Sequence, residues 1–296
     1  MHFKYTLLTI VAAIGWGFSG TCSEHLFKTY GTDGEWLTSV RLLSAGAMLI
    51  LICLASGHKR ELIGILKDKR ALATLLIFAV VGMMAVQYTY LTAIAHTNSG
   101  TATVLQYAGP AFVLFYICFT VRRLPTWRES ASLVGILIGV FLIATHGDIT
   151  SLAISRAGLF WGIASAVFLA AHDIIPVRII QRWGSLPVTA WSMFIGGIVL
   201  SLLTRPFSYE PTINLDSLLT FGGLVLIGTV FSFTAFLAGV AKIGPVKASI
   251  VASIEPIAAS IFSFVWVGTH FTAYDIVGMA LILIAVYILT NAPQKN

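Results

Sequence analysis

The sequence predicts an all-α integral membrane protein, and three observations support this fold class. Hydrophobic residues make up 57% of the 296 residues, charged residues make up only 10%, and the mean hydropathy is +0.91. Soluble domains carry about 25% charged residues. Apolar segments of roughly 20 residues, the length that a bilayer-spanning helix needs, recur along the whole chain. Lipid is therefore the natural solvent of this chain.

Ten of these segments are predicted to span the bilayer as helices, and short loops join most of them. They cover residues 5–23, 36–56, 71–92, 101–121, 131–146, 157–179, 188–204, 218–240, 247–267 and 274–290. The fifth and the seventh are the shortest. The first segment follows a single Lys4 and has no A-x-A cleavage signal, so we expect a retained span rather than a signal peptide.

The 18 Lys and Arg residues are distributed unevenly over the predicted loops. With the N-terminus inside, only Lys28, Arg156 and Arg205 fall on outer loops, Arg41 falls within a span, and the rest face inside. Cytoplasmic loops of membrane proteins carry such an excess. Both termini are therefore predicted to be cytoplasmic, and the net charge of +6 reflects topology rather than nucleic-acid binding.

The two halves of the chain, residues 1–146 and 147–296, resemble each other in four places. Trp16-Gly17 aligns with Trp161-Gly162 at an offset of 145, Gly82 with Gly228 and Pro110 with Pro256 at 146, and residues 133–139 with 276–282 at 143. Each half holds five predicted spans, so the second half enters the membrane upside down. Two inverted five-helix repeats are an architecture in which a carrier alternates access around a central site. A structural duplication without transport is the alternative.

Several short motifs carry a resemblance to a known family. They are GWG at 15–17, FWG at 160–162, QYAGP at 106–110, IEP at 254–256 and the glycine-patterned closing segments at 135–139 and 278–283. With them, the chain resembles the EamA-type carriers of the drug/metabolite transporter superfamily over almost its entire length. The resemblance implies ten spans in two inverted halves, an inner-membrane location and the export of amino acids or other small metabolites. Arg122 and Thr269 stand where the family often has a glutamate, so no role of that acid carries over.

Glu255 is the only ionisable side chain in the apolar run from Ala248 to Val267. A charge near the bilayer centre costs roughly 2.5–3.5 kcal/mol on insertion scales, so a carboxyl at this position requires a structural or functional explanation. It is either a satisfied carboxyl between helices or a site for a proton or a substrate amine. Its repeat counterpart is Gly109, so only one of the two mirrored positions carries an acid.

Three prolines lie within predicted spans: Pro110, Pro176 and Pro256. Each leaves the carbonyl four residues earlier without its helical donor. The polar groups near them are, in order, Gln106, the His172-Asp173 pair and Glu255. A freed carbonyl at membrane depth is tolerated where protein or a water-filled cavity satisfies it. The three helix kinks therefore predict a cavity where the repeats meet.

Polar and aromatic residues around this cavity are candidate ligands of a substrate. The predicted substrate-binding set is Gln106, Tyr107, Tyr88, Trp161, His172 and Glu255, and the candidates for proton coupling are Glu255 and Asp173. Core packing is the simpler explanation for each aromatic residue, and a packing hydrogen bond is the simpler one for His172 and Asp173. Glu24 and Arg41 are expected to pair across the first outer loop, or else Arg41 binds a substrate carboxylate through its planar fork.

The sequence contains no P-loop lysine motif, no H-E-x-x-H and no G-x-S-x-G elbow. Cys22, Cys53 and Cys118 have no metal-binding spacing, and neither a metal nor a cofactor is expected.

The leading hypothesis is a secondary transporter of the inner membrane that exports small metabolites by alternating access. Amino acids or related compounds are the favoured substrates, and proton antiport would run through Glu255 or Asp173. The alternative is a membrane-embedded structural or assembly subunit without transport activity. The expected partners are a small-molecule substrate and the lipid bilayer, and a homodimer is left open.

Overall fold

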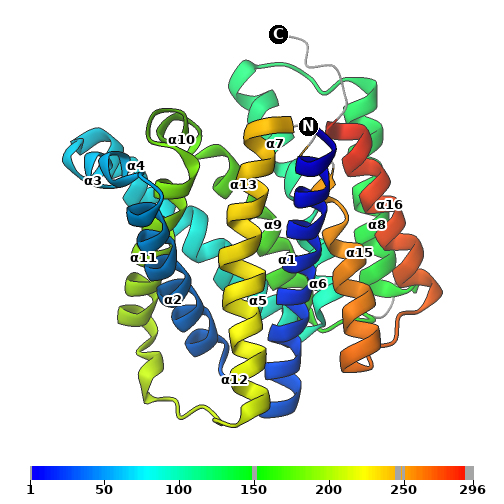
Figure 1. Cartoon of the computed structure of the whole chain (residues 1–296). Helices are drawn as coiled ribbons and strands as arrows, with labels where there is room; N and C mark the ends of the chain where they lie inside the picture. The colour runs from blue at the N-terminus through cyan, green and yellow to red at the C-terminus, as the bar shows by residue number, and fades with distance from the viewer. Residues whose placement is uncertain (1, 149–151, 244–247, 249–250, 291–296) are drawn as a thin grey trace.

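The computed structural model describes residues 2–148, 152–243, 248 and 251–290, and every regular element within them is a helix (Figure 1). Eight helical segments are long and apolar enough to cross a membrane: Phe3–Tyr30, Gly34–Ala55, Lys69–His96, Ser99–Val121, Trp127–Thr145, Arg156–Ile174, Ser185–Thr204 and Leu215–Val240. Two shorter apolar helices follow, Glu255–Val267 and Ala273–Leu289. The all-α membrane fold is therefore confirmed. The start of the predicted span 247–267 falls partly on positions 247, 249 and 250, which lie outside the described residues.

Several helices extend beyond their predicted bounds. Helix α1 (His2–Tyr30) runs past residue 23, and α8 (Trp127–Thr145) and α11 (Ser185–Thr204) begin before their apolar runs. In α8 a capping box explains the early start, since the Thr126 side chain and Glu129 bond to each other's backbone N–H. The predicted inner loop also contains α3 (Lys59–Lys67), an amphipathic helix with buried Leu62 and Ile65 that hydropathy alone does not reveal.

The remaining α-helices are α2 (Gly34–Ala55), α4 (Lys69–Ile77), α5 (Ala85–His96), α6 (Ser99–Gln106), α7 (Gly109–Val121), α9 (Arg156–Ile174), α10 (Val177–Trp183), α12 (Leu215–Gly222), α13 (Ser232–Ile243), α15 (Glu255–Phe262) and α16 (Ala273–Thr290). Wider π-helical segments continue three of them: η1 (Phe78–Met84) follows α4, η3 (Gly223–Phe231) follows α12, and η4 (Ser263–Val267) follows α15. A short 3-10 turn, η2 (Pro206–Ser208), follows α11.

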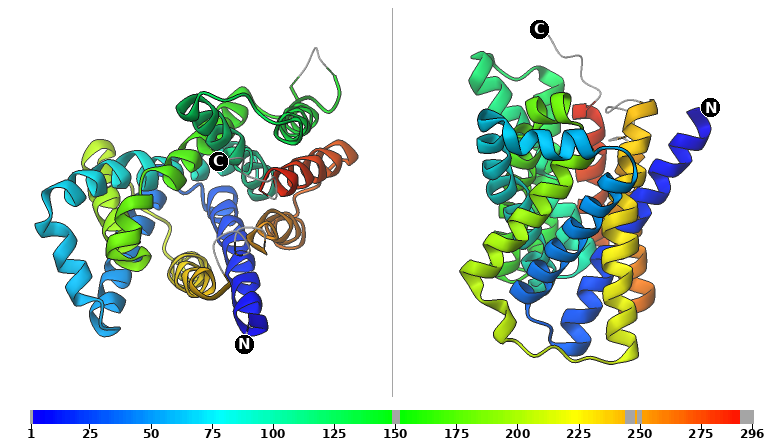
Figure 2. Two further views of the ribbon diagram at one scale, coloured as in Figure 1. Left: turned by 90° about the horizontal axis from the view of Figure 1, so that it is seen from above. Right: turned by 60° about the vertical axis from the view of Figure 1, so that its left-hand side comes forward.

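The packing of the helices joins the two halves of the chain. Helix α1 packs against η3, α13, α15 and α6, while α9 packs against η1, α5, α6 and α7. Two further pairs run side by side, α2 with α11 and α8 with α16 (Figures 1 and 2). Positions that an offset of 146 relates also share local structure, because Gly82 and Gly228 both lie in π-helical segments and a helix begins beside both Pro110 and Pro256.

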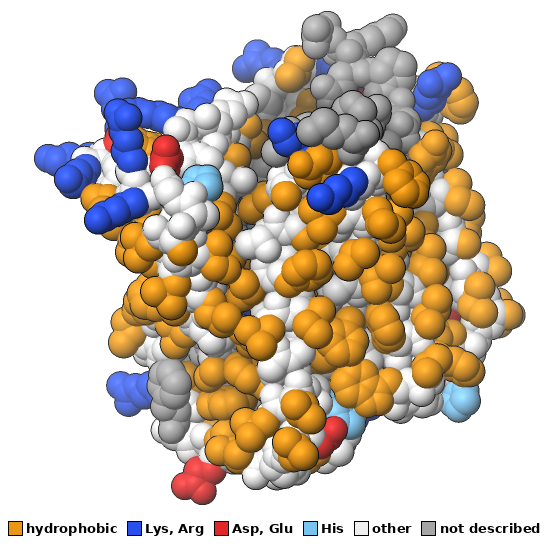
Figure 3. All heavy atoms as spheres, in the orientation of Figure 1, with side chains coloured by type: hydrophobic (Ala, Val, Ile, Leu, Met, Phe, Trp, Pro, Cys, Tyr) orange, Lys and Arg blue, Asp and Glu red, His pale blue; other side chains and the backbone are white. Residues whose placement is uncertain are grey.

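The outer surface combines an apolar belt with one basic end. Hydrophobic side chains cover the middle of the face in Figure 3, and Lys and Arg side chains gather at the end that holds α3, α4 and α10. This basic end includes the exposed residues Lys59, Arg60, Lys67, Lys69 and Arg70. Helix α1 begins and α16 ends at the same end of the molecule (Figure 1). The belt suits contact with lipid tails, and the basic end suits an interface with water.

Helices α2 and α11 approach each other closely at Gly46. A Cβ atom added there would lie 2.5 Å from the backbone nitrogen of Phe194 and 2.7 Å from its Cα. We expect Gly46→Ala to lower the free energy of unfolding by about 1–3 kcal/mol, because overpacking would force the two backbones apart. Gly222→Ala in α12 is the matched control, since a Cβ there meets no atom within 4 Å. Alanine is the better helix former, so the control should keep or gain stability. Unfolding of the two detergent-solubilised variants measures their free energies of unfolding. An equal change of this free energy in both variants would contradict the close contact at Gly46.

Asp68 joins α3 to α4 outside the membrane-spanning segments. Its carboxylate accepts hydrogen bonds from the backbone N–H groups of Ala71 and Arg70 at 3.1 and 3.0 Å, and it lies 2.7 Å from Arg182 Nη1. These contacts hold the pKa of Asp68 below its ordinary value. A lowered folded pKa adds stability above the unfolded pKa, and this stability is lost as the pH falls through the folded pKa.

We therefore expect Asp68→Ala to lower the Tm at neutral pH and to have progressively less effect below the ordinary aspartate pKa of about 3.9. Thermal unfolding of the two purified proteins over a pH series measures this difference. A difference in Tm that stays constant into strong acid would show that the charge of Asp68 is not what stabilises the α3–α4 junction.

Candidate functional site

Two helix breaks, one from each half of the chain, bring Tyr107 and Glu255 together. Helix α6 ends at Gln106 and α7 begins at Gly109, while α15 begins at Glu255 itself. The Tyr107 hydroxyl lies 2.8 Å from the carbonyl oxygen of Ala252 and 3.2 Å from Glu255 Oε2. Pro256 leaves this same carbonyl without a helical donor, so Tyr107 supplies the missing hydrogen bond.

The Tyr107 hydroxyl has one proton and two acceptors within reach. If it donates to Ala252, its contact with Glu255 needs a proton on the carboxyl, which then donates to the phenol oxygen. If Glu255 is a carboxylate, the phenol donates to it and the Ala252 carbonyl loses its donor. The same three groups thus accommodate both protonation states of Glu255 through the rotation of one O–H bond.

Arg41 of α2 is the cation that acts electrostatically on Glu255. Its side chain is buried, with 3% of its surface exposed, and its Nε donates to Thr229 Oγ1 in η3 at 3.1 Å. Its Nη1 has no hydrogen-bond partner. Tyr90 of α5 is also buried, and its hydroxyl lies 2.7 Å from Thr103 Oγ1. Among the described residues, this buried polar region holds the Arg41 cation and the Glu255 carboxyl, and no ion pair joins these two groups.

The predicted pairing of Glu24 with Arg41 is wrong. Helix α1 continues to Tyr30, which places Lys28 one helical turn beyond Glu24 on the same face. The Lys28 ammonium lies 2.7 Å from Glu24 Oε1. Arg41 instead turns toward Thr229, so the acid and the arginine belong to two different polar clusters.

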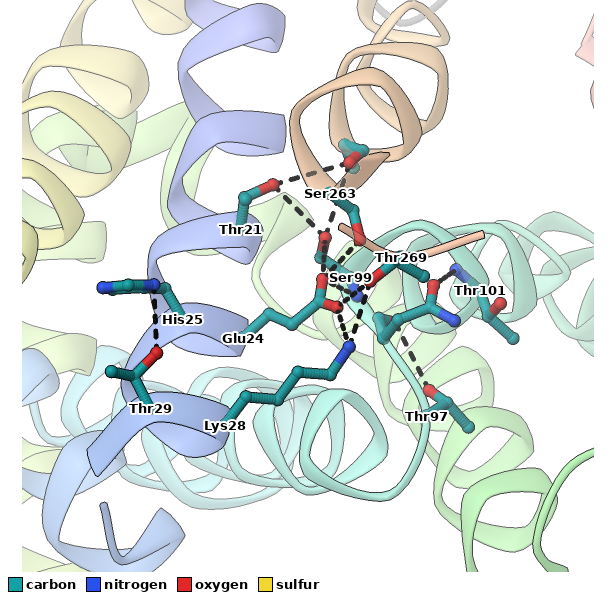
Figure 4. A network of polar contacts seen from close by, with 12 residues as sticks. Thr21, Glu24, His25, Lys28, Thr29, Thr97, Ser99, Thr101, Ser263 and Thr269 are labelled. Atoms are coloured by element: carbon teal, nitrogen blue, oxygen red, sulfur yellow. Dashed lines mark hydrogen bonds and ion pairs between the residues drawn. The ribbon is translucent and has the colours of Figure 1, made fainter. Parts of the chain in front are cut away.

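Glu24 is completely buried and is the centre of a polar network that joins three segments (Figure 4). Glu24 Oε2 accepts hydrogen bonds from the backbone N–H and the hydroxyl of Ser99 in α6, at 2.9 and 2.8 Å, and from the hydroxyl of Ser263 in η4 at 2.7 Å. Glu24 Oε1 accepts from the hydroxyl of Thr269 at 2.6 Å. Sequence reasoning missed this network because its donors other than Lys28 lie 75 to 245 residues away. The only local signal was an acid four residues before a lysine in an apolar helix.

Comparison with known proteins decides the family. The sequence profile of the EamA-like transporter family matches residues 3–145 and 156–291. The chain belongs to this family. YicL of Salmonella typhimurium, an inner membrane transporter whose name calls it uncharacterized, is 38% identical over 293 residues, which cover 99% of this chain and 97% of YicL. YwfM of Bacillus subtilis, named an uncharacterized transporter, is 23% identical over 296 residues, which cover 99% of this chain and 95% of YwfM.

A solved crystal structure shows the same overall fold. It is 16% identical to this EamA-like transporter, has a TM-score of 0.63 and covers 96% of both chains. Family and fold together establish a multi-pass membrane protein with transport as its general function.

The other predicted ligands of this EamA-like transporter lie in two further places. Tyr88 and Trp161 form an edge-to-face pair with ring centroids 5.7 Å apart, and the Tyr88 hydroxyl lies 3.4 Å from Glu35 Oε1. His172 Nδ1 lies 3.1 Å from Asp173 Oδ1, and the His172 ring packs on Phe78 with centroids 5.4 Å apart.

Gln106 is the predicted residue that adjoins the Tyr107–Glu255 contact, because it is buried directly before Tyr107. Asp173 is exposed, and none of its described hydrogen bonds reaches Tyr107 or Glu255. Pro176 lies at a third helix break, between α9 and α10. Within the described residues, no group of three His, Cys, Asp or Glu side chains could hold a metal ion.

Proposed function

We propose that this EamA-like transporter is a secondary carrier of the inner membrane that exports small metabolites, amino acids or related compounds, by alternating access. The contact of Tyr107 with Glu255 supports the proposal, because it lies where two broken helices meet and a carboxyl there could bind a proton. Broken helices that present polar groups near the membrane midplane are typical of secondary transporters. The name of the relative YicL supports the inner-membrane location.

Alternating access requires a gate on each side of the site. In the predicted topology, the loops after α1 and after η4 are outside and both termini are cytoplasmic. The Glu24 network ties α1, α6 and η4 together close to these loops. We take this network as a closed outer gate. Its rupture would let the outer ends separate as the two inverted five-helix halves, 1–146 and 147–296, rock against each other.

Proton antiport would supply the driving force. The Glu255 carboxylate can bind a proton or a substrate ammonium group, but not both at once. On the acidic outer side a proton would displace the substrate, and on the inner side loss of that proton would free the carboxylate for the next substrate molecule. Arg41 and Tyr107 act on this carboxyl and would set the balance between the two ligands. Asp173 is the second candidate for the coupling group.

Counterflow in proteoliposomes with a panel of labelled amino acids tests the proposal. We expect at least one amino acid to exchange above the background of protein-free liposomes, and a proton gradient in the opposite direction should stimulate its movement. A structural or assembly subunit would show neither flux nor stabilisation by any member of the panel. The absence of both across the whole panel would overturn amino-acid export.

A further inference from the structure

Arg41 is a buried cation whose hydrogen-bonding capacity the protein does not use up. A guanidinium group presents five N–H donors in a planar fork. The Nε of Arg41 donates to Thr229 Oγ1, while its Nη1 has no partner although only 3% of the residue is exposed. A charge removed from water without compensating partners is unfavourable. A ligand that accepts hydrogen bonds from the free N–H groups would therefore stabilise this side chain.

The neighbouring groups orient Arg41 without neutralising it. The Thr229 hydroxyl donates its own proton to the carbonyl of Leu224 at 2.9 Å, so it accepts from Arg41 through a lone pair. The hydroxyl of Tyr90 is engaged with Thr103. Glu255 acts on Arg41 electrostatically but is in contact with Tyr107. Arg41 is therefore held in one direction with part of its fork free.

Two more buried polar groups without a partner lie on the adjoining face of α1. They are Trp16 Nε1 and Ser19 Oγ, three residues apart and so on one side of the helix. Ser19 lies against Gly228, the residue before Thr229. The Trp16 ring contacts Phe233 and Phe236 of α13, with centroids 5.2 and 4.9 Å apart. Helices α1 and α2 therefore present N–H and O–H groups without a described partner beside η3 and α13.

We propose that Arg41 binds the carboxylate of the transported metabolite, so that the substrates of this carrier bear a carboxylate group. A carboxylate is a pure acceptor and matches the planar fork of arginine with two parallel hydrogen bonds. Glu255 would then receive the substrate ammonium, and the two ends of a zwitterionic amino acid would meet opposite charges. This assignment rests on the proposed function and narrows it, because amines that lack a carboxylate would bind poorly.

Ligand-induced thermal stabilisation of the full-length protein in detergent tests the assignment. The probes are the common amino acids and, for each one that binds, the amine without its carboxylate and the acid without its amino group; for leucine these are 3-methylbutylamine and 4-methylpentanoate. We expect Arg41→Gln to weaken binding of the carboxylate-bearing probes on the order of 10- to 100-fold. The affinity of Arg41→Lys for these probes should lie between those of wild type and Arg41→Gln, because lysine keeps the charge but lacks the planar fork. Arg156→Gln, the same change at an exposed arginine, should have no effect.

Binding of the amines separates this role from a general effect on Glu255. An Arg41→Gln variant that acted only through Glu255 would change binding of the amines and of the amino acids to the same extent, whereas loss of a carboxylate ligand weakens binding of the amino acids far more than it changes binding of the amines. If amino acids bind wild type and Arg41→Gln equally well, the carboxylate site is wrong and the carrier function stands. The same conclusion follows if wild type binds amines as tightly as amino acids. If no probe binds wild type, both the carboxylate site and amino-acid export fail. If Arg41→Gln does not fold, the same comparison of amino-acid binding with amine binding is made with Arg41→Lys.

Discussion

Replacing Glu255 with glutamine is expected to abolish proton-coupled transport while the protein remains folded. Glutamine keeps the length of the side chain and can still accept a hydrogen bond from the Tyr107 hydroxyl, but it cannot take up or release a proton. Transport driven by a pH gradient should therefore fall to the background of protein-free liposomes. Flux into proteoliposomes at a series of imposed pH gradients measures this loss, and the unfolding temperature confirms that the variant is intact.

Asp173→Asn is the matched control for this substitution. It makes the same acid-to-amide change at the second candidate for proton coupling, an exposed residue whose carboxylate lies beside His172. We expect this variant to keep its response to the pH gradient, because Asp173 makes no direct contact with Tyr107 or Glu255 among the described hydrogen bonds. Unchanged pH-dependent flux in Glu255→Gln would remove Glu255 as the coupling group. If Asp173→Asn then lost that response, the role would pass to Asp173.

The fold could be predicted from the sequence because its main determinants are local. Long apolar runs identify the spans wherever lipid is the solvent, and a proline interrupts a helix wherever it falls. The helix ends were less predictable, since they depend on caps such as Thr126 with Glu129 and not on hydropathy. Helix α3 was missed for a similar reason, because its apolar residues follow the periodicity of an amphipathic helix and not a continuous run.

The candidate site was predictable only in part. Pro256, Glu255 and Tyr107 were conspicuous in the sequence, and the structure places the Tyr107 hydroxyl against both Glu255 and the carbonyl that Pro256 leaves free. Apart from Lys28, the partners of Glu24 and Arg41 were not predictable, because they follow from how α1, α2, α6, η3 and η4 pack in three dimensions. Arg41 and Thr229 are 188 residues apart, and no periodicity or spacing relates them.

The Glu24 network leads to the second large effect, because Glu24→Ala is expected to open the end of the transporter that the predicted topology places outside. The substitution removes the acceptor of the bonds from the Ser99 backbone and hydroxyl and from the hydroxyls of Ser263 and Thr269. A hydrogen bond to a charged group contributes about 1.5–3 kcal/mol, and such contributions do not add fully. A net loss of about 3 kcal/mol from the closed state would raise the ratio of open to closed molecules roughly 100-fold.

A reporter cysteine at Thr21 measures this opening. The Thr21 hydroxyl lies 3.2 Å from that of Ser99, on the face of α1 that the network closes. In a chain whose three native cysteines are replaced by alanine, a membrane-impermeant maleimide added outside should label Thr21→Cys slowly, and much faster when Glu24→Ala is also present. Glu210→Ala, at an exposed glutamate, is the control. A Glu24→Ala protein that stays folded and labels no faster would show that these bonds only stabilise the fold. Faster labelling from the outside alone would instead assign Glu24 to the gate, since general unfolding would expose the reporter to both sides.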